Sequence, residues 1–108
     1  MAEFVPVPHH EGFLAKNVFG PAERVLDVSI AHLEPHGGGP LPPHRHPERD
    51  HLFIVTQGVM EARTEQGVRR FGPDEALLVQ GGERHEIWNA GDGPAVVVGV
   101  TLAHGGEN

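Results

Sequence analysis

Short stretches of alternating apolar and polar residues recur along the whole chain. In residues 24–34, Leu26, Val28 and Ile30 fall on one face, and Asp27 and Ser29 fall on the other. A period of two is typical of a half-buried strand, and no stretch keeps the 3.6-residue period of an amphipathic helix. The pattern predicts strands over residues 3–7, 13–19, 24–34, 51–57, 59–64, 68–71, 76–79, 85–89 and 95–103.

Glycine and proline residues separate these predicted strands. Gly20-Pro21, Gly72-Pro73 and Gly81-Gly82 are typical turn signals. Residues 35–43 are so rich in glycine and proline that we expect an irregular loop there. So many short strands would leave exposed edges unless the sheet closed on itself. We therefore predict one all-β domain over residues 1–108, folded as a closed barrel.

The alternation also predicts which side chains line the barrel. The expected apolar lining is Ile30, Phe53, Val55, Val96, Val98, Val100 and Leu102. His32 shares the face of Ile30, so we expect it inside, in a packed or hydrogen-bonding role. The adjacent residues His9 and His10 are expected at the surface.

Composition narrows the classes of partner. Eight Lys and Arg residues against fifteen Asp and Glu residues give a net charge of −7 at neutral pH, which argues against nucleic acid and anionic membrane surfaces. No apolar run is long enough to span a membrane. Residues 1–20 lack the basic start and apolar core of a signal peptide, so a cytoplasmic location is expected. The absence of cysteine excludes disulfides and thiolate chemistry.

Four of the nine histidines stand where a metal site would need them. His44 and His46 are two residues apart, so both side chains would leave the same face of an extended strand. Pro47 bends the chain, His51 begins the next predicted strand, and His85 begins another one downstream. Imidazole is the commonest metal ligand in proteins. We predict that His44, His46, His51 and His85 hold one divalent transition metal ion inside the barrel.

The two histidine-containing segments resemble the two sequence motifs of small single-domain cupins. The first motif is matched by Gly38, His44-Arg45-His46, His51 and Gly58, and the second by residues 82–89, from Gly82 through His85 to Asn89. The motifs and the hairpin between them cover roughly half of the chain. The resemblance implies a double-stranded β-helix, or jelly roll, with a small-molecule ligand bound in its barrel.

The match to the cupin motifs is incomplete at the fourth ligand. His51 stands where the family's motif has a glutamate, with six residues between it and Gly58. A looser spacing would make Asp50 the ligand instead, on the opposite face of the strand. We prefer His51, because it keeps the motif's spacing to Gly58 and shares the face of Phe53 and Val55. Four-histidine sites are known among cupins. Gln80 replaces the motif's proline, and Asp74-Glu75 replaces the usual Gly-Asp pair.

The predicted ligand set indicates the chemistry. Four neutral imidazoles leave the charge of the ion unneutralised, which favours an anionic chelating ligand. Nitrogen ligands suit Fe, Mn, Zn, Ni or Cu and do not select among them. The resemblance therefore implies a metal-dependent dioxygenase or other oxidoreductase acting on a small organic acid or chelating carbonyl compound. A metal-dependent isomerase, lyase or decarboxylase and a non-catalytic binding protein are the alternatives. Metal-centred chemistry is preferred because the alternation predicts no inward Asp, Glu, Lys or Tyr.

Leu52 and Ile54 are expected on the outer face of their strand, where no helix of this chain could cover them. Apolar patches of this kind are commonly buried by a second subunit. Small cupins often pair in this way, so we expect a homodimer.

Overall fold

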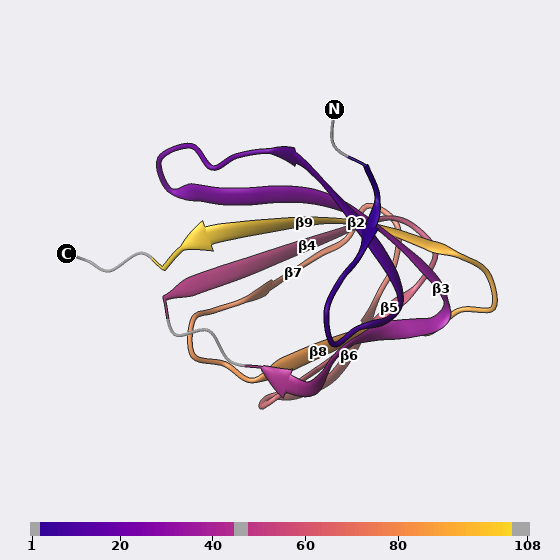
Figure 1. The fold of residues 1–108 in the computed structure, drawn as a ribbon. Helices are drawn as coiled ribbons and strands as arrows, with labels where there is room; N and C mark the ends of the chain where they lie inside the picture. Colours follow the sequence, from indigo (N-terminus) through magenta and orange to yellow (C-terminus); the bar gives the residue numbers. More distant parts are fainter. Residues whose placement is uncertain (1–2, 45–47, 105–108) are drawn as a thin grey trace.

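The structure, a computed structural model, describes residues 3–44 and 48–104, with the backbone alone for residues 42–44. This part of the chain contains nine strands and no helix, as predicted (Figure 1). The strands are β1 (Val5–Pro6), β2 (Glu11–Phe19), β3 (Val25–His44), β4 (Arg49–Gln57), β5 (Met60–Thr64), β6 (Gly67–Phe71), β7 (Ala76–Val79), β8 (His85–Asn89) and β9 (Ala95–Ala103). No helix suited to crossing a membrane is found among the residues described.

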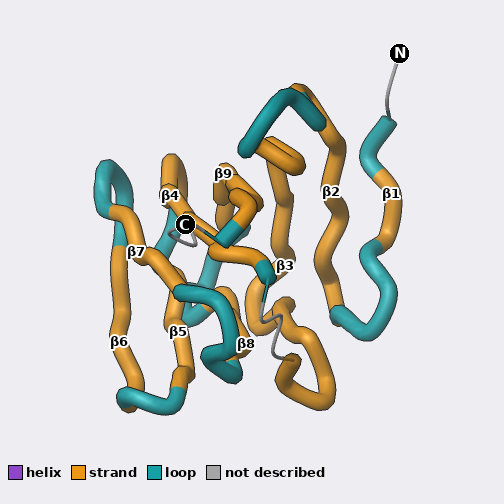
Figure 2. The backbone as a smooth tube through the Cα atoms, turned by 90° about the vertical axis from the view of Figure 1, so that its left-hand side faces the viewer, coloured by secondary structure: helices purple, strands orange, loops and turns teal. Residues whose placement is uncertain are grey.

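The strands form one antiparallel sheet that curls into a nearly closed barrel. Its order is β6-β5-β8-β3-β9-β4-β7, with β2 added to β3 and β1 added to β2. Figure 2 shows β5, β6 and β8 on one side of the barrel and β1 and β2 on the other. The long strand β3 belongs to both walls, because its first half pairs with β2 and β9 and its second half pairs with β8. The prediction of a jelly-roll barrel is confirmed.

The predicted loop over residues 35–43 is wrong, because this segment continues β3. A Cβ atom on Gly37 would lie 2.4 Å from the carbonyl oxygen of Gly12 in β2. A Cβ atom on Gly38 would lie 2.2 Å from the carbonyl oxygen of Ile87 in β8. These glycines therefore mark close packing of three strands rather than a break in the sheet.

The inner face of the barrel differs from the prediction by one residue on β3 and β9. Ala31, Val97 and Val55 are paired across β3, β9 and β4, and all three are buried. Paired residues of neighbouring strands share a face, so Ile30 and Val98 lie on the outside. The predicted inward positions of Val96 and Val98 were wrong because β9 carries valine on both faces, whereas Val100 of the same predicted stripe does line the pocket. Phe53 and Val55 face inward as predicted.

His32 lies outside the barrel rather than inside it. Its ring stacks on Phe4, with 4.2 Å between the ring centroids. The Nζ atom of Lys16 lies 4.9 Å from the centroid of the same Phe4 ring. The one-residue shift of the inner face explains this correction, because His32 and Ile30 alternate with the inward residue Ala31.

The buried Asn89 joins the end of β8 to β3 and to the loop before β9. Its Nδ2 atom donates to the carbonyl oxygens of Leu33, Glu34 and Gly93, at 3.3, 3.1 and 2.8 Å. Its Oδ1 atom accepts from the N–H of Gly91 at 2.9 Å. The asparagine of the second motif thus closes one end of the barrel by satisfying backbone groups that β8 and β3 would otherwise leave buried.

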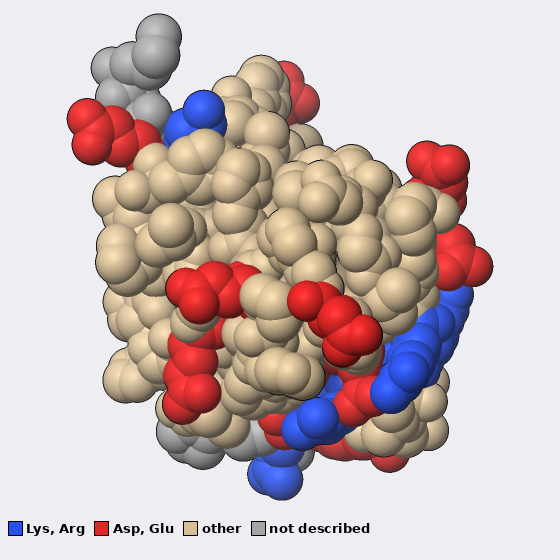
Figure 3. Space-filling model, turned by 90° about the vertical axis from the view of Figure 1, so that its right-hand side faces the viewer, with Lys and Arg blue, Asp and Glu red and all other residues tan. Residues whose placement is uncertain are grey.

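Charged side chains on β5, β6 and β8 form a local network of ion pairs. Glu61 accepts hydrogen bonds from Arg63 and Arg70, at 2.8 and 3.3 Å, and Arg63 lies 3.7 Å from Glu86. The hydrogen bond from Arg63, with a further contribution from Arg70, lowers the pKa of Glu61. Figure 3 shows most of the basic side chains of this face in one band at the lower right, with acidic side chains among them, and further acidic side chains outside the band.

Candidate metal and ligand site

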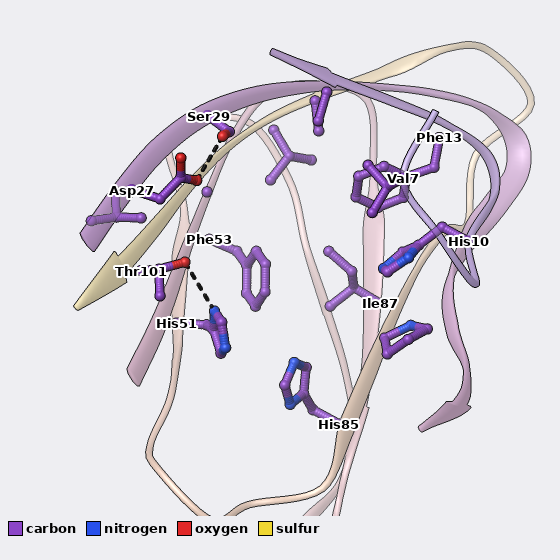
Figure 4. Close-up of a pocket in the computed structure, with 16 residues that line it drawn as sticks. Val7, His10, Phe13, Asp27, Ser29, His51, Phe53, His85, Ile87 and Thr101 are labelled. Carbon is purple, nitrogen blue, oxygen red and sulfur yellow. Dashed lines mark hydrogen bonds between the residues drawn. The ribbon is translucent and has the colours of Figure 1, made fainter. Parts of the chain in front are cut away.

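A pocket of about 290 Å³ opens into the barrel, and apolar side chains make most of its wall (Figure 4). The lining residues are Val7, His10, Phe13, Ala15, Asp27, Ser29, Ala31, Pro40, His51, Phe53, His85, Ile87, Val97, Gly99, Val100 and Thr101. An apolar pocket with a few convergent polar groups is the usual form of a small-molecule site. This pocket is therefore the candidate functional site.

His51 and His85 reach this pocket from two different walls. His51 comes from β4 and His85 from β8, and their ring centroids are 5.2 Å apart (Figure 4). His85 is only 6% exposed, and the Nε2 atom of His51 is shielded from solvent. The ring of Phe53 lies 6.1 Å from His51 and 6.2 Å from His85, centroid to centroid. The two imidazoles therefore face one another beside an apolar ring.

Hydrogen bonds at Nδ1 orient both of these imidazole rings. The Nδ1 atom of His85 donates to the carbonyl oxygen of Glu83 at 3.3 Å. The Nδ1 atom of His51 lies 3.3 Å from the hydroxyl oxygen of Thr101. A neutral imidazole that donates through Nδ1 presents the lone pair of Nε2, which is the form that binds a metal ion. The chemistry of this pair therefore fits a divalent transition metal ion.

The other two predicted ligands belong to the end of β3 and the segment after it. The backbone of His44 pairs with that of His85, so both residues lie at the same end of the barrel. The side chain of His44 and the whole of His46 lie outside the described residues. Within the part that is described, no three His, Cys, Asp or Glu residues are grouped closely enough to hold a metal ion. The four-histidine site stays a prediction.

Asp50, the alternative fourth ligand, does not line the pocket. Its Oδ1 atom accepts from the N–H of Gly81 at 2.7 Å and contacts Nδ1 of His104 at 2.8 Å. Burial raises the pKa of Asp50, but the hydrogen bonds from His104 and Gly81, together with nearby positive charge, lower it further than burial raises it. Because adjacent residues of a strand face opposite ways, Asp50 lies on the outer side when His51 lines the pocket.

Four polar pocket residues, Asp27, Ser29, Thr101 and His10, were missed by the sequence analysis. Asp27 and Ser29 line the pocket, although the alternation assigned them to the outside. The alternation correctly paired them on one face, and the error was the choice of inner face. His10, expected at the surface, also lines the pocket, with its ring 4.6 Å from the ring of Phe13 and its Nδ1 atom 2.8 Å from the carbonyl oxygen of Pro8. No pattern in the sequence indicates that β1 and β2 fold over this opening.

The antiparallel barrel and the two histidines in its pocket fit the cupin class that the sequence motifs resemble. Comparison with known sequences agrees with this assignment. Residues 29–101 match the family model described as Cupin domain. The chain belongs to this cupin family.

Proteins similar to this chain carry different names. The chain is 36% identical over 69 residues to the tetracenomycin polyketide synthase protein TcmJ of Streptomyces glaucescens. The matched region covers 64% of this chain and 46% of TcmJ. It is 25% identical, at a TM-score of 0.74, to a sugar phosphate isomerase of the cupin superfamily from Silicibacter pomeroyi, covering 84% of this chain and 59% of the other. A predicted oxalate decarboxylase from Thermotoga maritima superposes at a TM-score of 0.82 and 14% identity, covering 94% of this chain and 91% of the other. The last likeness shows the fold alone.

The chain spans less than half the length of TcmJ. The family therefore assigns the fold to this chain, whereas the reaction has to be argued from the residues in the pocket.

Proposed function

We propose that this cupin is a metal-dependent enzyme that acts on a small organic acid or chelating carbonyl compound. One divalent transition metal ion would be held by His44, His46, His51 and His85. The observation that carries the proposal is the pair His51 and His85, which face one another in the apolar pocket with their Nδ1 atoms engaged. The backbone pairing of His44 with His85 supports the wider ligand set.

Oxygen chemistry of the dioxygenase type is the first candidate for the reaction. An ion of Fe, Mn, Ni or Cu in this site would supply a redox centre and a Lewis acid. Phe53, Ile87 and Val97 would keep water away from the reacting group, and Thr101 would hold the His51 ring in place. Among the described lining residues, Asp27 is the one carboxylate and none is Lys or Tyr, which favours chemistry at the metal over proton transfer by a side chain.

An isomerase, lyase or decarboxylase is the second candidate, and one observation favours it. Asp27 places a carboxylate in the pocket, where the sequence analysis expected none. A carboxylate within reach of a bound substrate can accept and return a proton. The similarity to a sugar phosphate isomerase of the cupin superfamily supports this candidate as well.

The first test is the metal content of the wild type and of His51→Ala, each purified without added metal. We expect near-stoichiometric Fe, Mn, Zn, Ni or Cu in the wild type. The metal affinity of the variant should be lower by about tenfold or more, because one ligand is removed. The matched control is His32→Ala, which deletes an imidazole that stacks on Phe4 outside the barrel. Circular dichroism would verify that each variant is folded. A wild type that takes up none of these metals, even after reconstitution, would contradict the proposal.

Turnover separates an enzyme from a binding protein. The metal-loaded protein would be incubated with small hydroxy and keto acids, with and without oxygen. Consumption of acid and oxygen together would support the dioxygenase, and conversion without oxygen would support the second candidate. Ligand-induced stabilisation without conversion would show a binding protein. Gly99→Val tests whether the substrate binds in this pocket. A Cβ at Gly99 meets no atom within 4 Å, and the larger valine side chain would narrow the pocket.

A further inference from the structure

A row of polar side chains crosses the inner face of the barrel. Asp27 on β3 pairs with Thr101 on β9, and Thr101 pairs with His51 on β4. Neighbouring strands are about 4.8 Å apart, so the backbones of Asp27 and His51 are separated by roughly 10 Å. Figure 4 shows Asp27 and Ser29 on the other side of Phe53 from His85. The pocket therefore has a second polar end, remote from the two histidines.

Hydrogen bonds hold the Asp27 carboxylate in place at this end. Ser29 Oγ donates to Asp27 Oδ2 at 2.6 Å, and Asn17 Nδ2 donates to Asp27 Oδ1. Each oxygen of an ionised carboxylate can accept more than one hydrogen bond, so Asp27 keeps the capacity to bind a ligand donor. Ser29 and Asn17 thus orient the Asp27 carboxylate and leave its oxygens able to accept a further hydrogen bond from a ligand.

No lysine or arginine among the described pocket residues balances the charge of Asp27. Among the lining residues that the structure describes, Asp27 is the one acid, and none is Lys or Arg. Asp27 is half-buried, and the pocket wall beyond it is largely apolar. A hydroxyl or ammonium group would be favoured beside Asp27, and a second negative charge would be disfavoured.

We propose that Asp27 is a specificity-determining residue that accepts a hydrogen bond from a donor group at the end of the ligand remote from the metal. The ligand class is then an organic acid with a distal hydroxyl or ammonium group, and dicarboxylates of the same length are rejected. This inference rests on the proposed function, because the metal would bind the acid group at the histidine end.

Four acids of equal chain length test this assignment, since they differ only in the distal group. These are hexanoate, 6-hydroxyhexanoate, 6-aminohexanoate and adipate, titrated into the metal-loaded protein by isothermal calorimetry. We expect 6-hydroxyhexanoate and 6-aminohexanoate to bind about fivefold more tightly than hexanoate, and adipate about tenfold more weakly. In Asp27→Asn, adipate gains about tenfold and the preference for 6-aminohexanoate is lost.

The controls separate selectivity from folding. Asp92→Asn removes one negative charge from an exposed loop and should keep the wild-type order of affinities. Ser29→Ala is a second variant that leaves the carboxylate but removes the hydroxyl that holds it, and it should reduce the preference for the donor-terminated acids about twofold to threefold. Metal content is measured for every variant before titration.

Two different failures can be recognised. If hexanoate binds but all four acids have equal affinity, or if Asp27→Asn leaves the order unchanged, the role of Asp27 is refuted and the proposed function stands. If none of the acids binds to the metal-loaded wild type, the proposed function and the role of Asp27 are both refuted.

Discussion

Asp50 and His51 are consecutive residues of β4, and their side chains lie on opposite sides of the barrel wall. His51 faces Phe53 and His85 in the pocket. Asp50 ties β4 to the turn at Gly81 and to His104 beyond the end of β9. The carboxylate that resembled a possible metal ligand in the sequence therefore acts, in the structure, as an acceptor that joins three segments.

Asp50→Asn should make stability less dependent on pH in the acid range. The folded state lowers the pKa of Asp50 from 3.8, so the folded protein favours the ionised form. The stabilisation is present above the unfolded value and is lost as pH falls through the folded value. We expect Asp50→Asn to cost on the order of 1 kcal/mol at neutral pH and much less below the folded pKa.

Urea unfolding at several pH values measures this difference. Asp92→Asn, on an exposed loop, is the matched control and should unfold as the wild type does. A constant difference between Asp50→Asn and the wild type across the acid range would contradict the assigned role of the ionised carboxylate.

At the scale of elements, β3 shows where sequence patterns reach their limit. The bounds of β7, β8 and β9 agree with the prediction, because turn residues flank these short strands. Glycine and proline in residues 35–43 were interpreted as a loop, although Gly37 and Gly38 stand between β2 and β8. The same residues suit a loop or a crowded strand, and only the neighbouring strands distinguish the two.

Gly38→Ala should destabilise the barrel by about 3 kcal/mol or more, because the new methyl group would overlap the backbone of β8. The two strands would have to separate, and their pairing at Trp88 would weaken. Gly99→Ala, at a position with open space around it, is the control and should cost far less. Thermal or urea unfolding of the three proteins compares them, and equal stability would contradict the crowding described for β3.

At the scale of the whole molecule, the wall formed by β3, β9, β4 and β7 has an apolar outer face. Ile30, Val98 and Ile54 are paired across three strands on this face, and Leu52 and Leu78 are paired next to them. Leu78 is 48% exposed. We propose, as the sequence predicted from Leu52 and Ile54, that a second copy of the chain covers this face.

Ile54→Lys should convert such a dimer into a monomer while leaving the pocket intact. The new charge would be buried in an apolar interface, which disfavours association. Light scattering after size-exclusion chromatography measures the mass, and Val68→Lys, at an exposed position of β6 away from this wall, is the control. A wild type that is monomeric at all accessible concentrations would contradict the proposal.

The sequence by itself determined the all-β class, most strand positions and the cupin motifs, because turn residues and motif spacing are local properties. The tertiary structure decided which face of β3 and β9 is inner. Alternation has only two solutions, and valines on both faces of β9 left them equivalent until Val97 was paired with Ala31 and Val55. That choice moved His32 out of the barrel and brought Asp27 into the pocket beside Ser29. The second polar end of the pocket is therefore a consequence of strand pairing between segments far apart in the chain.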